Sequence, residues 1–374
     1  MTSREQRKLD HIHYALELGD GERRTGLEEV HFLHHCLTPV NPGTVGMTAR
    51  IGSLRLAVPL FLDAVTGGAE PVTDVNRRLA RTARLAGCAM AVGSQYGTVH
   101  QGTDPSSYTV VREEYPDGIF FANMSALATP EEARQAVDML GASALEIHLN
   151  TAQELCMPEG DRDFAFLRDN LRRLQDAVPV PVLVKETGCG MAREQVEELR
   201  SLGFTCFNVA GFGGTSFPAI ETARGGRGRQ SVLAGWGIPT AWSLVGAAAA
   251  ASPTDTIVAS GGLRNGTDVA KALALGADAA AMSGNVLARV LREGPEQAAA
   301  FLRDCLADLQ DIMVLTGARN LAALHRIPLV FTGTLLDFMQ SRGYDTRRKD
   351  RRAREERPGG RPCSRPGPAG RGHL

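Results

Sequence analysis

The most informative group of polar side chains in this chain lies in the stretch 148–162, H-L-N-T-A-Q-E-L-C-M-P-E-G-D-R, directly after an apolar run typical of a buried strand. The side chains of His148, Asn150 and Gln153 can hydrogen-bond a phosphate group, and the Glu154 carboxylate is a hard oxygen ligand suited to Mg²⁺. A lone histidine at a strand end is more often structural, and Glu-Gly-Asp-Arg runs are usually solvated turns. So many polar groups after one buried strand nevertheless indicate a binding site, because unpaired buried polar groups are costly.

The elements that must position these residues follow a regular alternation. Apolar runs predict eight strands, at residues 58–64, 89–92, 119–123, 144–149, 180–185, 206–210, 256–259 and 277–282. Amphipathic segments between them predict helices, among them 72–86, 130–140, 193–202 and 267–275. Thr129-Pro-Glu-Glu is a clear helix start. Eight doubly buried strands, most followed by a helix, predict a parallel (β/α)8 TIM barrel. An open doubly wound sheet is the alternative, but no G-x-G-x-x-G follows the first strand.

Small and polar residues follow all eight predicted strands, and in a barrel these ends form one mouth. Ser-Gly-Gly at 260–262 and Ser283-Gly284 follow the last two strands, where barrel enzymes commonly bind phosphate. The phosphate loop on the last two strands, together with the Asn, Ser, Thr and Lys side chains at the other strand ends, suits flavin mononucleotide, with Lys185 beside the N1–O2 edge of the flavin. Lys185 could instead be a Schiff-base lysine or a structural ion-pair partner of Glu186.

Composition limits the remaining possibilities. No run of 18 apolar residues and no apolar N-terminal region is present. We therefore expect no membrane span and no secretion, and we expect a cytoplasmic location. Seven scattered cysteines without a C-x-x-C pair fit reduced thiols. Residues 347–374 carry ten Lys/Arg and three Asp/Glu, a net charge of +7, and predict a disordered tail. This tail is a solubilising extension or, as the alternative, a nucleic-acid contact; we expect no nucleic-acid partner. We therefore expect the barrel domain, with an N-terminal extension, over residues 1–346.

The stretch after the fourth strand also resembles the H-L-N-x-x-Q-E-x-x-x-P-E-G-D-R segment of type 2 isopentenyl-diphosphate isomerases, which are FMN-dependent. Further similar motifs are Arg7-Lys8-Leu-Asp-His, Phe120-Phe-Ala-Asn, Gly211-Phe-Gly-Gly-Thr-Ser-Phe, Trp236-Gly-Ile-Pro-Thr and Ala259-Ser-Gly-Gly-Leu-Arg-Asn-Gly. The resemblance covers about residues 4 to 345. It implies interconversion of isopentenyl and dimethylallyl diphosphate with reduced FMN and Mg²⁺, a nicotinamide cofactor such as NADPH to reduce the flavin, and a homo-oligomer, either tetramer or octamer.

The resemblance also implies roles for particular residues. FMN would contact Ala64, Val65, Thr66, Ser94, Asn123, Lys185, Thr215, Gly262, Leu263, Arg264, Ser283 and Gly284. The substrate diphosphate would contact Arg7, Lys8, His148, Asn150 and Gln153. Glu154 would hold Mg²⁺, and His148, Gln153 and Glu154 would be the catalytic group.

Five positions depart from the family pattern. Asp63 replaces a neutral residue, Val65 a Met, Glu146 a Gln, Tyr96 an Arg and Cys189 a Phe in many members. Two other readings of the sequence remain open. One is an FMN barrel oxidoreductase of the 2-hydroxy-acid oxidase or dehydrogenase type. The other is a flavin-binding paralogue without catalytic activity, for which the basic tail would be a contact surface.

Overall fold

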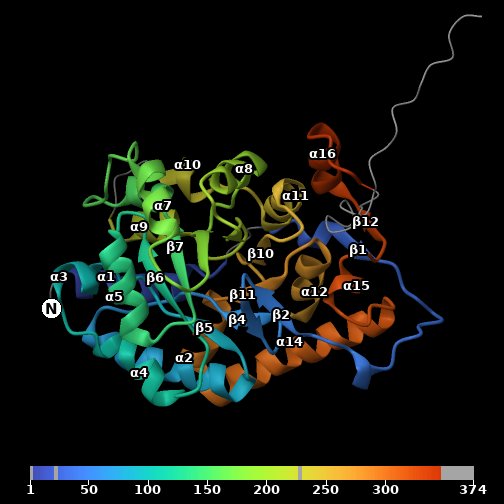
Figure 1. Ribbon diagram of the computed structural model, residues 1–374, viewed down its shortest axis with the longest axis horizontal. Coiled ribbons are helices and arrows are strands. Elements are labelled where there is room, and N and C mark those ends of the chain that lie inside the picture. Colours follow the sequence, from blue (N-terminus) through green and yellow to red (C-terminus); the bar gives the residue numbers. More distant parts are fainter. Residues whose placement is uncertain (1–2, 21–23, 226–229, 347–374) are drawn as a thin grey trace, which may run out of the picture.

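The computed structural model describes residues 3–20, 24–225 and 230–346, and its centre is a closed barrel of parallel strands (Figure 1). The barrel strands in chain order are β4 (Leu60–Leu62), β5 (Ala89–Ala91), β6 (Phe120–Ser125), β7 (Ala144–Leu149), β8 (Val182–Glu186), β9 (Cys206–Asn208), β10 (Thr256–Ala259) and β11 (Ala279–Met282). Around the barrel the order is β10-β11-β4-β5-β6-β7-β8-β9. The predicted TIM barrel is therefore confirmed, and all eight predicted strands overlap observed ones.

The strands form because their residues are buried on both faces. Most positions in β4, β5, β6, β9, β10 and β11 are fully buried, with Phe61 and Phe121 packed edge to face inside the barrel. Continuous apolar runs of this kind are typical of parallel strands covered by helices. In β7 and β8 the burial decreases toward the carboxyl end, where His148 and Glu186 lie.

Helices surround the barrel, on its outside and at its mouth. Their bounds are α1 (Ser3–Leu18), α2 (Thr73–Ala86), α3 (Tyr96–Gln101), α4 (Ser106–Glu114), α5 (Pro130–Leu140), α6 (Thr151–Cys156), α7 (Leu167–Gln175), α8 (Arg193–Ser201), α9 (Phe217–Ala223), α10 (Gln230–Ala234), α11 (Thr240–Ala250), α12 (Gly266–Ala274), α13 (Gly284–Arg292), α14 (Pro295–Leu315), α15 (Leu321–Leu324) and α16 (Gly333–Ser341). The helices predicted at 72–86, 130–140, 193–202 and 267–275 correspond to α2, α5, α8 and α12. Thr129 and Glu132 form the complete capping box expected at the start of α5.

Two small antiparallel sheets lie outside the barrel. β1 (Val30–Phe32) pairs with β12 (Leu329–Phe331), and β2 (Ala49–Ile51) pairs with β3 (Leu54–Leu56). The β2–β3 turn lies at the amino ends of the barrel strands, because the Gly52 N–H donates to Thr256 Oγ1 at 3.0 Å at the start of β10. The β1–β12 pairing joins distant segments, whereas β2 and β3 form a local hairpin, and neither pairing was predicted.

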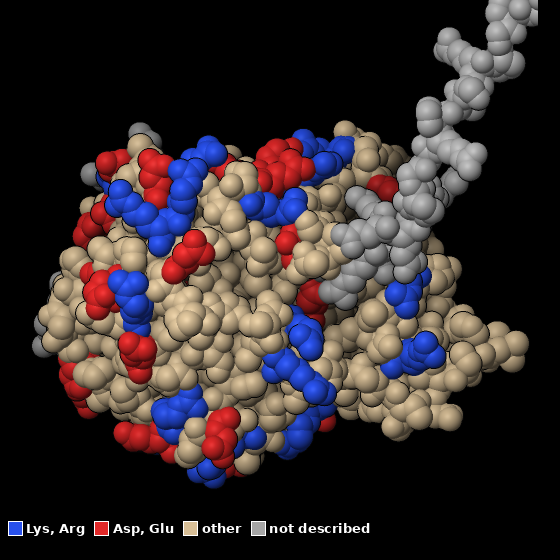
Figure 2. All heavy atoms as spheres, in the orientation of Figure 1, with Lys and Arg blue, Asp and Glu red and all other residues tan. Residues whose placement is uncertain are grey.

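The long helix α14 packs against α2 and α12 and runs along the lower edge of the molecule in Figure 1. Among the described residues no helix is both long and apolar enough to cross a bilayer. Acidic and basic side chains are interspersed over the face in Figure 2. The tail expected at 347–374, and with it the predicted domain boundary, lies outside the described residues.

Candidate active site

A cavity of about 810 Å³ opens at the carboxyl ends of the barrel strands, within the size range of cofactor and ligand sites. Its wall is completed by α1 and α9. Of the residues assigned from the sequence, those that line it are Arg7, Lys8, Ala64, Val65, Ser94, Asn123, His148, Asn150, Gln153, Glu154, Lys185, Thr215, Gly262, Leu263, Ser283 and Gly284. The structure thus brings together residues as far apart in the sequence as Arg7 and Gly284.

One end of the cavity is built from backbone. Gly262 has a φ of +73°, and a Cβ there would lie 2.4 Å from the Gly213 carbonyl oxygen, so only glycine fits. A Cβ on Gly284 would meet Thr215 Oγ1 at 2.5 Å. Gly284 opens α13, whose N-cap residue Ser283 makes no side-chain cap bond. The first N–H groups of a helix lack partners within the helix, so this end fits a phosphate group.

A buried ion pair lies deeper in the cavity. Lys185 Nζ, at the end of β8, is 3.1 Å from Asp63 Oδ1, directly after β4, and the two side chains are only 7% and 5% exposed. Burial lowers the pKa of Lys185, but attraction to Asp63 and Glu146 outweighs burial and raises it above its ordinary value. Lys185 therefore carries a positive charge.

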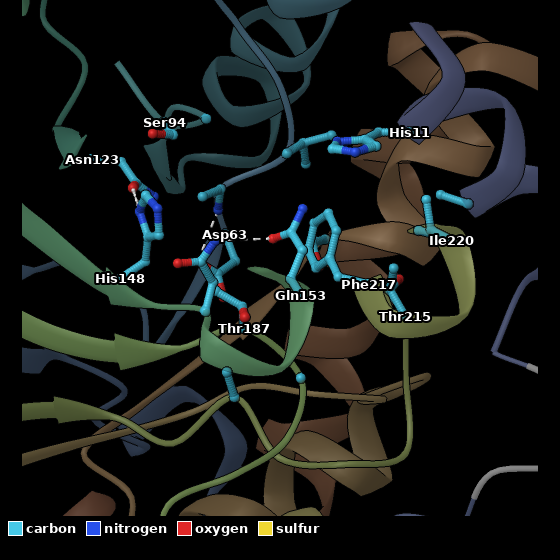
Figure 3. A pocket seen from close by; sticks show the side chains of 18 of the residues that line it. His11, Asp63, Ser94, Asn123, His148, Gln153, Thr187, Thr215, Phe217 and Ile220 are labelled. Atoms are coloured by element: carbon cyan, nitrogen blue, oxygen red, sulfur yellow. Dashed lines mark hydrogen bonds between the residues drawn. The ribbon is translucent and has the colours of Figure 1, made fainter. Parts of the chain in front are cut away.

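A chain of polar side chains continues from this pair to His148. Asn208 Nδ2 lies 3.4 Å from Asp63 Oδ2 and 3.5 Å from Glu146 Oε1. Asn123 Nδ2 donates to Glu146 Oε2 at 3.3 Å, and His148 Nδ1 lies 2.7 Å from Asn123 Oδ1 (Figure 3). Burial, with Lys185 and Lys8 nearby, lowers the pKa of His148 to about 3. The imidazole is therefore neutral at pH 7.

A second polar cluster lies where α1 and α9 meet α6. His11 Nε2 is 2.7 Å from Glu221 Oε1, and Gln153 Nε2 donates to the same oxygen at 3.0 Å. The Arg224 guanidinium forms an ion pair with the other Glu221 oxygen and with Asp10, at 3.4 Å. Burial would raise the pKa of Glu221, but His11, Gln153 and Arg224 together lower it to about 2. Figure 3 places Gln153 and His11 beside Phe217, across the cavity from the Asn123–His148 pair.

Glu154 lies at the rim of the cavity. Its carboxylate accepts hydrogen bonds from Asn150 Nδ2 at 2.8 Å and from the Asp161 N–H at 3.0 Å. Among the described residues no group of three or more His, Cys, Asp or Glu could hold a metal ion. A cation here would therefore take most of its ligands from a substrate or from water, as Mg²⁺ commonly does.

Two residues assigned to FMN from the sequence do not line the cavity. Thr66 is buried behind its wall, and its Oγ1 has no hydrogen-bond partner. The Arg264 guanidinium donates to the carbonyls of Gly262 and Gly213 and pairs with Asp20 at 3.3 Å. It therefore holds the Gly213 and Gly262 loops together from outside the cavity.

The alternative partner considered for Lys185 was wrong. Lys185 pairs with Asp63, whereas the Glu186 carboxylate accepts the backbone N–H groups of Thr187, Gly188 and Cys189. Burial raises the pKa of Glu186 to about 7.

Sequence reasoning missed the second cluster. Glu221 and Arg224 were assigned no role, and His11 only completed a motif. The available signal was weak: Glu221 and Arg224 are one helical turn apart, just after the Gly211–Thr215 loop. Because His11 and Glu221 are 210 positions apart, no local pattern joins them.

Comparison with known proteins places this geometry in a family. The family model for FMN-dependent dehydrogenases matches residues 113–330. The isopentenyl-diphosphate delta-isomerase of Symbiobacterium thermophilum is 44% identical over 355 residues, covering 92% of this chain and 97% of the relative. The enzymes of the same name from a Geobacillus strain and Bacillus licheniformis are 39% and 40% identical, each covering 92% of this chain and 98% of the relative.

The chain belongs to the isopentenyl-diphosphate delta-isomerase family. The resemblance stated from the motifs is thus confirmed. Solved mandelate oxidase structures are also similar, one with a TM-score of 0.60 at 19% identity, covering 86% of this chain and 92% of the oxidase. At that identity the likeness shows a shared barrel fold and not a shared reaction. The family match to FMN-dependent dehydrogenases supports FMN as the cofactor.

Proposed function

We propose that this chain interconverts isopentenyl diphosphate and dimethylallyl diphosphate, with reduced FMN and Mg²⁺. One observation carries the proposal. A single cavity joins a backbone phosphate cradle and a buried lysine, which suit FMN, to a rim of basic and amide side chains with Glu154, which suits a diphosphate–Mg²⁺ complex. The relatives at 39% and 44% identity are isopentenyl-diphosphate delta-isomerases, which supports the same reaction here.

The residues present fit FMN. Its phosphate would meet the N–H groups at the start of α13 and the Gly262 loop, because both offer donors and no side chain obstructs them. Its pyrimidine edge would lie near Lys185 and Asn123. When bound and reduced, FMN supplies a group that can exchange a proton with the substrate.

The remaining lining residues would bind the substrate. Arg7, Lys8 and the His148–Asn150 segment would hold the diphosphate, and Glu154 would share Mg²⁺ with its oxygens. The apolar walls of Phe217 and Ile220 would take the hydrocarbon tail and exclude water from it.

The reaction moves one proton on and another off an allylic unit, so the groups beside the tail must stay in fixed positions. Gln153 is held by Glu221, and His148 is held by Asn123. We propose that these two side chains orient the substrate and the transferred proton. No net oxidation occurs, so NADPH is needed only to reduce the flavin. By the family resemblance we further propose a cytoplasmic homo-oligomer, tetramer or octamer.

The Glu154→Gln variant tests this proposal. Gln keeps the shape but removes the charge, so FMN binding should stay unchanged while isomerisation slows at least about tenfold, about 1.4 kcal/mol of barrier. The Mg²⁺ concentration for half-maximal rate should rise as well. Glu197→Gln, a partly exposed residue on α8 paired with Arg193, is the control and should behave as the parent.

The assay should follow alkene isomerisation by the photoreduced holoenzyme, with and without Mg²⁺. If Glu154→Gln turns over and responds to Mg²⁺ like the parent, the metal assignment is wrong. Reduction of the oxidised flavin by an added 2-hydroxy acid, with no isomerisation by the photoreduced enzyme, would instead support a 2-hydroxy-acid oxidase type of activity. Flavin binding with neither reaction would support the non-catalytic paralogue.

A further inference from the structure

The Asp63–Lys185 ion pair crosses the interior of the barrel. β4 and β8 are each separated by three strands in both directions around the closed sheet, so they face one another. Asp63 follows β4 and Lys185 lies in β8, yet their charged atoms are 3.1 Å apart. Both residues line the cavity, so the pair forms part of its floor.

Asp63 is held rigidly in this position. Its Oδ1 accepts the Ala64 N–H at 2.8 Å, and Asn208 Nδ2 lies 3.4 Å from its Oδ2. The Ser260 hydroxyl donates to Asn208 Oδ1 at 2.7 Å and fixes that amide in turn. A carboxylate with this many fixed contacts cannot swing away when a ligand enters, so its charge stays beside Lys185.

Of the other titratable groups near Lys185, Glu146 and His148 add little charge at neutral pH, and the partly ionised Glu186 carboxyl faces its own loop. Burial and the neighbouring Asp63 charge raise the pKa of Glu146 to about 8, so its carboxyl is mainly protonated at pH 7. Glu186 is directed away into the backbone N–H groups of its own loop. His148 is neutral, because burial lowers its pKa to about 3. The floor therefore carries one positive and one negative charge, a net charge near zero.

This neutrality matters for a flavin. A lone cation beside the N1–O2 edge stabilises the anionic form of reduced flavin, and a cation already paired with a carboxylate does so much less. We propose that Asp63 is a tuning residue: by pairing with Lys185 it lowers the reduction potential of bound FMN and favours the neutral, N1-protonated reduced flavin. This inference rests on the proposed position of FMN over Lys185.

Anaerobic redox titration of the FMN-loaded protein tests the proposal. Asp63→Asn should favour the reduced flavin at least tenfold, which is about 30 mV for a two-electron couple. The absorbance of its reduced flavin should shift from the neutral toward the N1-deprotonated form. Asp63→Ser should shift the reduction potential and the absorbance in the same directions as Asp63→Asn, which shows that the effect is not peculiar to the Asn side chain. Flavin stoichiometry and circular dichroism verify that each variant is folded.

Two controls separate this effect from general disturbance of the barrel. Asp255→Asn removes a buried acid that pairs with Arg200 at 2.7 Å just before β10, at the opposite end of the barrel. It should leave the potential unchanged. Glu146→Gln should shift the reduction equilibrium less than about twofold at pH 7, because this carboxyl is already mainly neutral.

The Lys185→Gln variant distinguishes a failure of the Asp63 proposal from a failure of the proposed flavin position. It should lower the potential, opposite in sign to Asp63→Asn. If it shifts the potential and both Asp63 variants do not, the tuning role of Asp63 is wrong while the flavin position stands. If Lys185→Gln changes neither the potential nor FMN affinity, FMN does not lie over Lys185, and the proposed site itself is wrong.

Discussion

Glu146 and Glu221 lie just behind the wall of the same cavity, and both are fully buried. Their ionisation is nevertheless opposite. Burial raises the pKa of Glu146 to about 8. Burial acts on Glu221 in the same direction, yet its hydrogen-bond and charge partners lower its pKa to about 2.

The partners explain the difference. Glu146 faces amides at 3.3 and 3.5 Å and has the negative Asp63 nearby, while Lys185 pairs with Asp63. Glu221 instead has the Arg224 guanidinium on one oxygen, and His11 and Gln153 on the other. Depth of burial therefore does not set the charge of an acid; the donors that reach its oxygens do.

The environments of the two glutamates suit two different ligands of the cavity. The interior around Glu146 is nearly neutral, which suits the flat, weakly charged ring system proposed there. The rim around Glu221 holds fixed charges of both signs, which suits a diphosphate with its cation. Substitutions at the two glutamates should accordingly act in opposite directions.

Glu221→Gln should cause the largest change in the stability of the folded protein. It leaves the Arg224 guanidinium without its main buried partner, and breaking a buried pair costs about 3 kcal/mol. Urea unfolding at pH 7 should show this loss, with Glu197→Gln unchanged. Because the pKa of Glu221 is lowered to about 2, its stabilisation is present above about pH 4.5 and lost as pH falls toward 2. The two proteins should therefore converge in acid; a constant difference across pH would contradict the ion-pair explanation.

Glu146→Gln should change the free energy of unfolding in the opposite direction and, at pH 6, by a smaller amount. The raised pKa means that the folded protein keeps a proton that the unfolded chain has lost, so this residue's contribution declines from about pH 4.5 to 8. Gln is neutral throughout, and the variant should be more stable than the parent at pH 6 by on the order of 2 kcal/mol, a difference that grows toward pH 8. The difference should vanish near pH 4, as measured by unfolding at a series of pH values. A variant less stable than the parent at pH 8 would show that the pKa of Glu146 is not raised by folding.

Deleting residues 350–374 should have the smallest effect. The composition of this segment, with its excess of Arg and no aromatic residue, predicts no fixed contact with the barrel. Melting temperature and isomerase rate should equal those of the full-length protein within experimental error. Each glutamate variant should show the same change in stability in the shortened chain as in the full-length one. A change of assembly size by light scattering would instead identify the segment as a contact surface.

The barrel and most of the cavity could be predicted from the sequence, because parallel strands bring their carboxyl ends to one edge. Polar residues such as His148 and Lys185 at those ends therefore meet regardless of the loops between them. The Asp63–Lys185 pair was not predicted, because the sequence does not give the side-chain direction across the barrel. The Glu221 cluster was missed because its members come from helices whose docking depends on tertiary packing and not on any local pattern.

The position of α1 over the mouth has a consequence for biosynthesis. His11 leaves the ribosome early, but its partner Glu221 follows 210 residues later, a delay of roughly 10–40 s at ordinary elongation rates. During that interval α1 cannot make its contact with α9, since α9 does not yet exist. Helix α1 is therefore synthesised long before it can complete its docking, and the rim of the cavity is completed only after most of the barrel strands have been made.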